Sequence, residues 1–118
     1  MDGFTLITGG AGFIGSNYAS RCLQRGESIK IFDNLSRSGS IKNIDWLERT
    51  YGKGSFELVK GDVRDETAIN QAAKGAKRIL HLAAQVAVTT SVVDPVTDFA
   101  INALGTFNVL EAVREIGR

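Results

Sequence analysis

The chain has 118 residues, a length that suits one compact domain with a single core and is too short for two. Hydrophobic residues make up 43% and charged residues 23%, and no apolar run reaches the roughly 18 residues of a membrane span, which excludes a transmembrane or largely disordered protein. The formal net charge of +1 gives no electrostatic basis for nucleic acid or an anionic membrane as the main partner.

Short apolar runs alternate with longer amphipathic segments along the chain. In chain order the expected elements are a strand over 4–8, a helix over 13–24 that stops at Gly26, a strand over 28–32 that ends at Asp33, a helix over 41–48 that closes near Gly52, a strand over 56–59, a short helix over 67–73 and a strand over 78–83. The last element is a helix of about six turns, with Asp94 as N-cap and Pro95 in the first turn. Its apolar positions follow the spacing of an amphipathic helix: Phe99, Ala103, Phe107, Leu110 and Val113.

Strands that alternate with helices at this spacing predict a parallel sheet with right-handed crossovers and helices on both faces. The expected fold class is α/β, a doubly wound Rossmann-type sheet with strand order 3-2-1-4. The pattern calls for a fifth strand after Arg118, so residues 1–118 are interpreted as a truncated, N-terminal portion of such a domain.

Cys22 is the lone cysteine, which excludes an intrachain disulfide framework and a multi-cysteine metal site. The N-terminus carries Asp2 where a secretory signal would need basic residues and then a long apolar stretch. A reducing cytoplasm is therefore the expected location.

A glycine-rich segment, Thr8-Gly-Gly-Ala-Gly-Phe-Ile-Gly-Ser16, lies between the first strand and the first helix. It fits G-x-G-x-x-G from Gly10 to Gly15, and the G-x-x-G-x-x-G variant through Gly9, Gly12 and Gly15. Such a turn brings backbone N–H groups and the positive end of a helix against a pyrophosphate. The alternative is a plain glycine turn followed by a solvated acid.

Asp33 stands eighteen residues after Gly15, at the tip of the second strand, where a carboxylate can accept both ribose hydroxyls of an adenosine. A carboxylate there would repel the 2′-phosphate of NADP, so the expected cofactor is NAD. Arg37 could neutralise a phosphate, and is more simply interpreted as a solvated loop cation or a lid over the adenosine.

Asp62 follows the third strand and could accept a hydrogen bond from the adenine amino group, with Val63 packing on the base. An equal alternative is that Asp62 caps the next helix, a role that we assign to Asp65.

His81 is interpreted as a hydrogen-bonded core residue without a catalytic or metal-binding role. The small residues after it leave room for a ribose or nicotinamide. The hydroxyl-rich loop Thr89, Thr90 and Ser91 could touch substrate or only cap a turn. Asn102 lies among apolar neighbours, where its amide needs a backbone or water partner.

Five segments in order over the whole chain resemble the extended short-chain dehydrogenase/reductases, and within them the NAD-dependent nucleotide-sugar epimerases and dehydratases. They are TGGAGFIGSN, FDNLSR, GDVRD, HLAAQVAVTTS and NALGTFNVLEAV. The resemblance implies a cofactor site made of Gly9, Gly12, Phe13, Ile14 and Gly15 at the pyrophosphate, Asp33, Asn34, Ser36 and Arg37 at the adenosine ribose, Asp62 and Val63 at the adenine, Leu82, Ala83, Ala84 and Gln85 at the nicotinamide half, and Asn102 supporting local structure and a bound water. It places Thr89, Thr90 and Ser91 near a sugar nucleotide.

The chemistry of that family needs a tyrosine with a lysine four residues later, on a later helix. Neither Tyr18 nor Tyr51 has one, so this chain is expected to bind NAD without catalysis. The parent protein would then be an epimerase that uses transient hydride transfer, or a 4-epimerase or dehydratase of the same family. The rival interpretations are a non-catalytic NAD(H)-sensing or interaction protein and a short protein with a structural role.

A homo-oligomer is also expected. The strand over 79–82 would leave backbone groups unpaired at a sheet edge, and related enzymes commonly use the last helix in a dimer interface.

Overall fold

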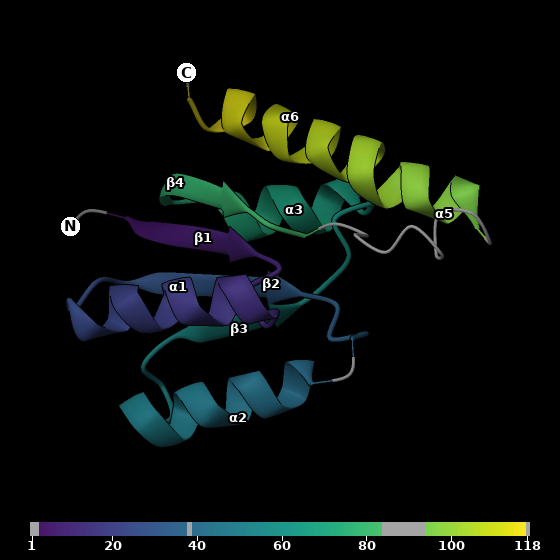
Figure 1. Cartoon of the computed structure of the whole chain (residues 1–118). Coiled ribbons are helices and arrows are strands. Elements are labelled where there is room, and N and C mark those ends of the chain that lie inside the picture. Colours follow the sequence, from purple (N-terminus) through teal and green to yellow (C-terminus); the bar gives the residue numbers. More distant parts are fainter. Residues whose placement is uncertain (1–2, 38, 84–93, 118) are drawn as a thin grey trace.

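The computed structural model describes residues 3–37, 39–83 and 94–117. Four strands form one parallel sheet (Figure 1): β1 (Phe4–Thr8), β2 (Ile29–Asp33), β3 (Glu57–Lys60) and β4 (Ala76–His81). Their order is β3-β2-β1-β4, which confirms the predicted fold class and strand order. The third strand lies one residue later than predicted, and the fourth begins two residues earlier.

Helices cover both faces of this sheet (Figure 1). They are α1 (Phe13–Gln24), α2 (Ser40–Tyr51), α3 (Glu66–Ala73), α5 (Pro95–Phe99), the π-helical segment η1 (Ala100–Leu104) and α6 (Gly105–Gly117). Among these described helices, none is long and apolar enough to cross a membrane.

The core is divided between the two faces because neighbouring residues of a strand point to opposite sides. Ile7 and Ile31 pack with the residues of α1 and α2, whereas Leu6 and Phe32 pack with those of α3 and α6. Both layers therefore depend on the same two central strands, whose carboxyl ends also carry the glycine-rich segment and Asp33.

Helix ends follow the expected capping chemistry. The Asp65 side chain accepts a hydrogen bond from Ala68 N (3.2 Å) at the start of α3, so the assigned capping role is confirmed. Asp94 accepts one from Thr97 N (3.2 Å) at the start of α5, again as predicted. Gly26, with φ +75°, follows α1 in the left-handed conformation that glycine adopts without strain.

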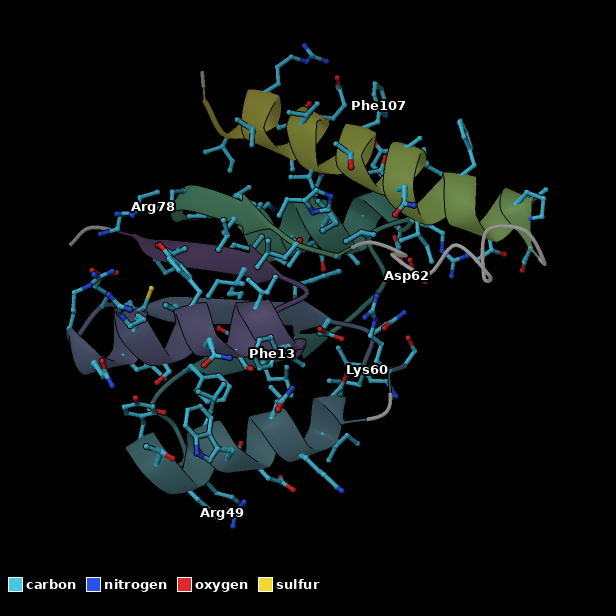
Figure 2. All side chains as sticks on the ribbon, in the orientation of Figure 1. Phe13, Arg49, Lys60, Asp62, Arg78 and Phe107 are labelled. Carbon is cyan, nitrogen blue, oxygen red and sulfur yellow. The ribbon has the colours of Figure 1, made fainter. Side chains whose placement is uncertain are left out.

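The last helix differs from its prediction in two ways. First, it is interrupted by η1. Second, the apolar positions that the amphipathic pattern assigns to the core are exposed to solvent; Phe107 is 57% and Leu110 62% exposed. In Figure 2, Phe107 lies on the side of α6 away from the sheet. The buried side is formed by the small residues Gly105 and Ala112, the polar Asn108 and the apolar Val109, and it packs toward α3.

Candidate functional site

A cavity of about 330 Å³ opens at the carboxyl ends of the strands. Its wall contains most of the residues predicted as cofactor-binding, namely Gly9, Gly12, Phe13, Ile14, Gly15, Asp33, Asn34, Ser36, Arg37, Asp62, Val63, Leu82 and Ala83. The cavity therefore collects four separate loops and strand ends at the place where the strand order reverses between β1 and β4.

The glycine-rich segment forms a tight loop on the floor of this cavity. Gly9 has φ +71°, and Gly12 N donates a hydrogen bond to its carbonyl oxygen (3.1 Å). A Cβ on Gly15 would overlap that same Gly9 oxygen, and a Cβ on Gly10 would lie 2.7 Å from an Ile31 side-chain carbon. Side chains are therefore excluded at these positions by the loop itself and by the sheet below it.

Helix α1 begins at the cavity, and its first residues, Phe13, Ile14 and Gly15, line the wall. Gly12 is the N-cap, and no side chain of the described residues caps this end. Phe13 is 81% and Ile14 67% exposed, although both are large and apolar. A helix start without a side-chain cap, next to exposed apolar side chains, favours a ligand that has both an anionic and an apolar part.

The Asp33 carboxylate holds two loops of the site together. Its Oδ2 accepts from Ala11 N (3.0 Å), and its Oδ1 accepts from Leu35 N (2.7 Å). Leu35 has φ +60°, an uncommon conformation for a residue with a branched side chain. The Asn43 side chain on α2 donates to Ala11 O (2.7 Å), so both main-chain groups of Ala11 are held by side chains. Each carboxylate oxygen keeps acceptor capacity for a further hydroxyl.

Asp62 forms an ion pair within its own loop. Its Oδ1 accepts from Arg64 N and Arg64 Nε, both at 2.9 Å, and Oδ2 lies 2.5 Å from Arg64 Nη2. Side-chain hydrogen bonds from Arg64 hold the pKa of Asp62 below its usual value. The capping alternative for Asp62 is wrong, because Asp65 occupies the cap of α3. Its predicted contact with adenine stays a prediction.

Val63 is buried behind Asp62 and is held by α6. Asn108 Nδ2 donates to Val63 O (3.0 Å), and a Cβ on Gly105 would lie 2.6 Å from Val63 Cγ2. Gly105 and Asn108 were not predicted as site residues. A small and a polar residue three positions apart lie on one side of a helix, and this pattern could have indicated a close contact there.

His81 at the end of β4 bonds to hydroxyls on both sides. Its Nδ1 lies 2.6 Å from Thr8 Oγ1, and its Nε2 lies 3.1 Å from Thr106 Oγ1. Burial lowers the pKa of this imidazole from its ordinary value. These bonds agree with the interpretation of His81 as a hydrogen-bonded core residue.

One predicted site residue, Asn102, does not line the cavity. It lies in η1, and its neighbour Ile101 lines the cavity instead. Four lining residues were not predicted from the sequence: Phe32, Ser40, Gly61 and Ile101. Ala84, Gln85, Thr89, Thr90 and Ser91 lie outside the described residues. Across the residues that the structure describes, no group of three or more His, Cys, Asp or Glu is placed to hold a metal ion.

Comparisons with known proteins agree on one family. The model of the family GDP-mannose 4,6-dehydratase matches residues 6–118. The chain is similar to CDP-paratose 2-epimerase of Salmonella typhi, with 47% identity over 93% of this chain and 32% of the relative. It is also similar to UDP-glucose 4-epimerase of Mycolicibacterium smegmatis, with 40% identity over 96% of this chain and 35% of the relative.

Among solved structures, the chain is similar to UDP-glucose 4-epimerase of Thermus thermophilus in complex with NAD. The TM-score is 0.80 and the identity 37%, over 95% of this chain and 34% of that one. The chain thus spans about a third of the length of these relatives.

Proposed function

This chain belongs to the GDP-mannose 4,6-dehydratase family, of the NAD-dependent epimerase/dehydratase type, and on this premise we propose that it is the NAD-binding portion of a nucleotide-sugar epimerase. The observation that carries the proposal is the convergence of the glycine loop, the start of α1 and Asp33 on one cavity. Homologous epimerases and dehydratases bind NAD, which supports the same cofactor here.

The residues around the cavity fit a dinucleotide. Gly9, Gly12 and Gly15 keep the loop free of side chains, so its N–H groups and the start of α1 can bind a pyrophosphate. The Asp33 carboxylate can accept ribose hydroxyls and disfavours a 2′-phosphate. On the far sides, Val63 would pack against the adenine, and Leu82 and Ala83 would border the nicotinamide half. The chemistry supplied by bound NAD is reversible hydride acceptance from a sugar carbon.

For the substrate, we infer a CDP-sugar epimerised at C2. Two long segments of this sequence, 32–47 and 81–95, resemble CDP-paratose 2-epimerase, and the identity to that relative is 47%. The second candidate, a 4-epimerase, is supported by the 40% identity to a UDP-glucose 4-epimerase. A dehydratase of the same family is the third.

Binding without turnover is the expected behaviour of the 118-residue chain. It carries no tyrosine with a lysine four residues later, the pair that the family uses to move protons. Incubation with NAD and CDP-sugars should leave the absorbance of the cofactor and the sugar stereochemistry unchanged. Turnover that survives repurification of the chain would contradict this.

Calorimetric titration of NAD and NADP into the chain tests the cofactor. We expect tighter binding of NAD, and about tenfold weaker NAD binding by Asp33→Asn, which removes one charged acceptor. Asp45→Asn, on the exposed side of α2, is the matched control and should bind as the parent chain does. Tighter binding of NADP than of NAD, or no binding of either, would overturn the assignment.

We also infer a second copy of this chain as a partner. The exposed apolar side chains Phe99, Phe107 and Leu110 lie along the outer side of α5 and α6, where a homologous helix could cover them. Sedimentation equilibrium should show association that weakens in Phe107→Ser/Leu110→Ser. A monomer at all concentrations would contradict it.

A further inference from the structure

The Thr8 hydroxyl, at the end of β1, is the centre of a chain of hydrogen bonds. Leu82 N and Ala83 N both donate to Thr8 Oγ1, at 3.0 and 3.2 Å. Leu82 N also reaches Thr8 O at 3.0 Å. A hydroxyl oxygen has two lone pairs and one hydrogen. With both lone pairs engaged by backbone N–H groups, the hydrogen is left for His81 Nδ1 at 2.6 Å.

This count favours one neutral tautomer of His81. Nδ1 accepts from Thr8 and is bare, so the neutral ring carries its proton on Nε2. Nε2–H then donates to Thr106 Oγ1 (3.1 Å), and the Thr106 hydroxyl donates to the carbonyl oxygen of Asn102 (2.8 Å). Every donor in this series meets an acceptor, and the opposite tautomer would place two hydrogens between Thr8 and His81.

The chain of bonds joins three elements at the cavity. Thr8 ends β1, His81 ends β4, and Thr106 lies in the first turn of α6. Leu82 and Ala83, which donate to Thr8, form one wall of the cavity. That wall touches the glycine loop, because a Cβ on Gly9 would lie 2.8 Å from Ala83 N. The position of the wall relative to the loop therefore depends on the bonds of the Thr8 hydroxyl.

We propose that His81 is a positioning residue: as the neutral imidazole with its proton on Nε2, it orients the Thr8 hydroxyl so that the Leu82–Ala83 wall is fixed against the glycine loop and linked to α6. For its role in nucleotide binding, the proposal rests on the proposed function. The positioning itself is a property of the nucleotide-free chain.

Protonation of His81 would break this arrangement. A hydrogen on Nδ1 would face a hydroxyl whose lone pairs are already engaged, so Thr8 would have to release Leu82 or Ala83 or turn away from the ring.

In the described parts of the elements around His81, the charged side chains either pair with each other or lie away from the imidazole ring. On α6, Glu111 pairs with Arg114, and in the loop before α3, Asp62 pairs with Arg64. Lys77 and Arg78 stand near the start of β4, at the other end from His81, and Asp65 and Glu66 stand at the exposed start of α3. Burial, with hydroxyl partners on both sides, keeps the ring neutral.

The experiment uses the single histidine of the sequence. In a chain labelled with ¹⁵N-histidine, the ring shifts identify the tautomer directly. We expect Nε2–H at neutral pH in the parent chain and in both Thr106→Ser and Thr106→Val, because neither variant changes the Thr8 hydroxyl that meets Nδ1. Amide hydrogen-exchange protection of Ala83 should fall about tenfold, the value of one net hydrogen bond, as His81 titrates. Protection of Leu82, whose N–H also bonds to Thr8 O, should fall less. Protection of Ile31 in β2 is the control and should not follow this titration.

An Nδ1–H tautomer at neutral pH would overturn the proposal. So would protection of Ala83 that does not change with the titration, or protection of Ile31 that falls in parallel, since a parallel fall indicates global unfolding. Calorimetry with NAD is a separate arm. Failure to bind NAD at any pH would count against the proposed function and leave the tautomer and exchange results to decide the role of His81.

Discussion

The two sides of the cavity are built by different means. On the side of β1, α1 and β2, the turn of the glycine loop is made by backbone contacts between residues close in sequence, such as Gly12 N with Gly9 O, and Asp33 and Asn43 then hold its tip. On the side of β4 and α6, the wall is held by side chains from distant positions: Thr8 with His81, and Asn108 with Val63. A local backbone constraint leaves a pattern in the sequence, whereas a contact between distant side chains does not.

The largest effect is expected from a substitution in the glycine loop, on the side of β1, α1 and β2. Gly15→Ala places a Cβ against the Gly9 carbonyl oxygen and 2.7 Å from Gly10 Cα, so backbone would have to move. We expect a loss of about 3 kcal/mol or more in the free energy of unfolding, measured by urea denaturation. The matched control is Gly12→Ala, where the nearest atom would be 3.3 Å away; its loss should be under about 1 kcal/mol. Equal losses in the two variants would contradict the steric argument.

Gly105→Ala tests the second side by the same kind of change. Inside a helix this substitution normally stabilises by about 1 kcal/mol, but here the new Cβ would meet Val63 Cγ2 at 2.6 Å. We expect a net loss of about 1–2 kcal/mol. A Val63→Ala background removes Cγ2 and leaves only Val63 Cβ, 3.2 Å from the new atom, so the same change should cost less there. An equal loss in that background would show that the contact with Val63 Cγ2 is not the cause.

The pH dependence of stability tests the side of β4 and α6, where His81 lies. Burial lowers the pKa of folded His81 from 6.5, so the unfolded chain binds the proton more readily. The contribution to stability is complete above pH 6.5 and is lost as the pH falls toward the folded pKa. We expect a decline smaller than either glycine effect, measured by denaturation at stepped pH. In His81→Asn, this part of the pH dependence should be absent.

The smallest effect is expected outside both sides of the cavity. Phe107→Ala removes a large side chain that is 57% exposed and should change stability by less than about 0.5 kcal/mol at concentrations where the chain is monomeric. Val109→Ala, two residues on and 5% exposed, should cost about 1–2 kcal/mol. A larger loss of stability in Phe107→Ala than in Val109→Ala would mean that α6 packs on the sheet with its other face.

The contrast explains what the sequence could predict. The helix Phe13–Gln24, the strand order and the place of Asp33 beside the glycine loop follow from periodicity and short-range spacing, and the structure has them as predicted. The orientation of α6 could not be predicted, since Phe107 and Leu110 have the spacing of a core stripe and yet are exposed. The contacts of Asn108 with Val63 and of Thr106 with His81 join residues 25 or more positions apart, so no local pattern indicates them. The π-helical turn at Ala100–Leu104 was not predicted either.

The hold on Ala11 has a consequence for the rate of binding. Its N–H is bonded to Asp33 and its carbonyl to Asn43, so the tip of the glycine loop has its shape before any nucleotide arrives. A loop that is already formed needs no slow rearrangement after encounter, and association should then be a single phase whose rate rises linearly with nucleotide concentration. Asn43 on α2 and Asp33 on β2 would thus influence the association rate of the nucleotide without contacting its phosphates.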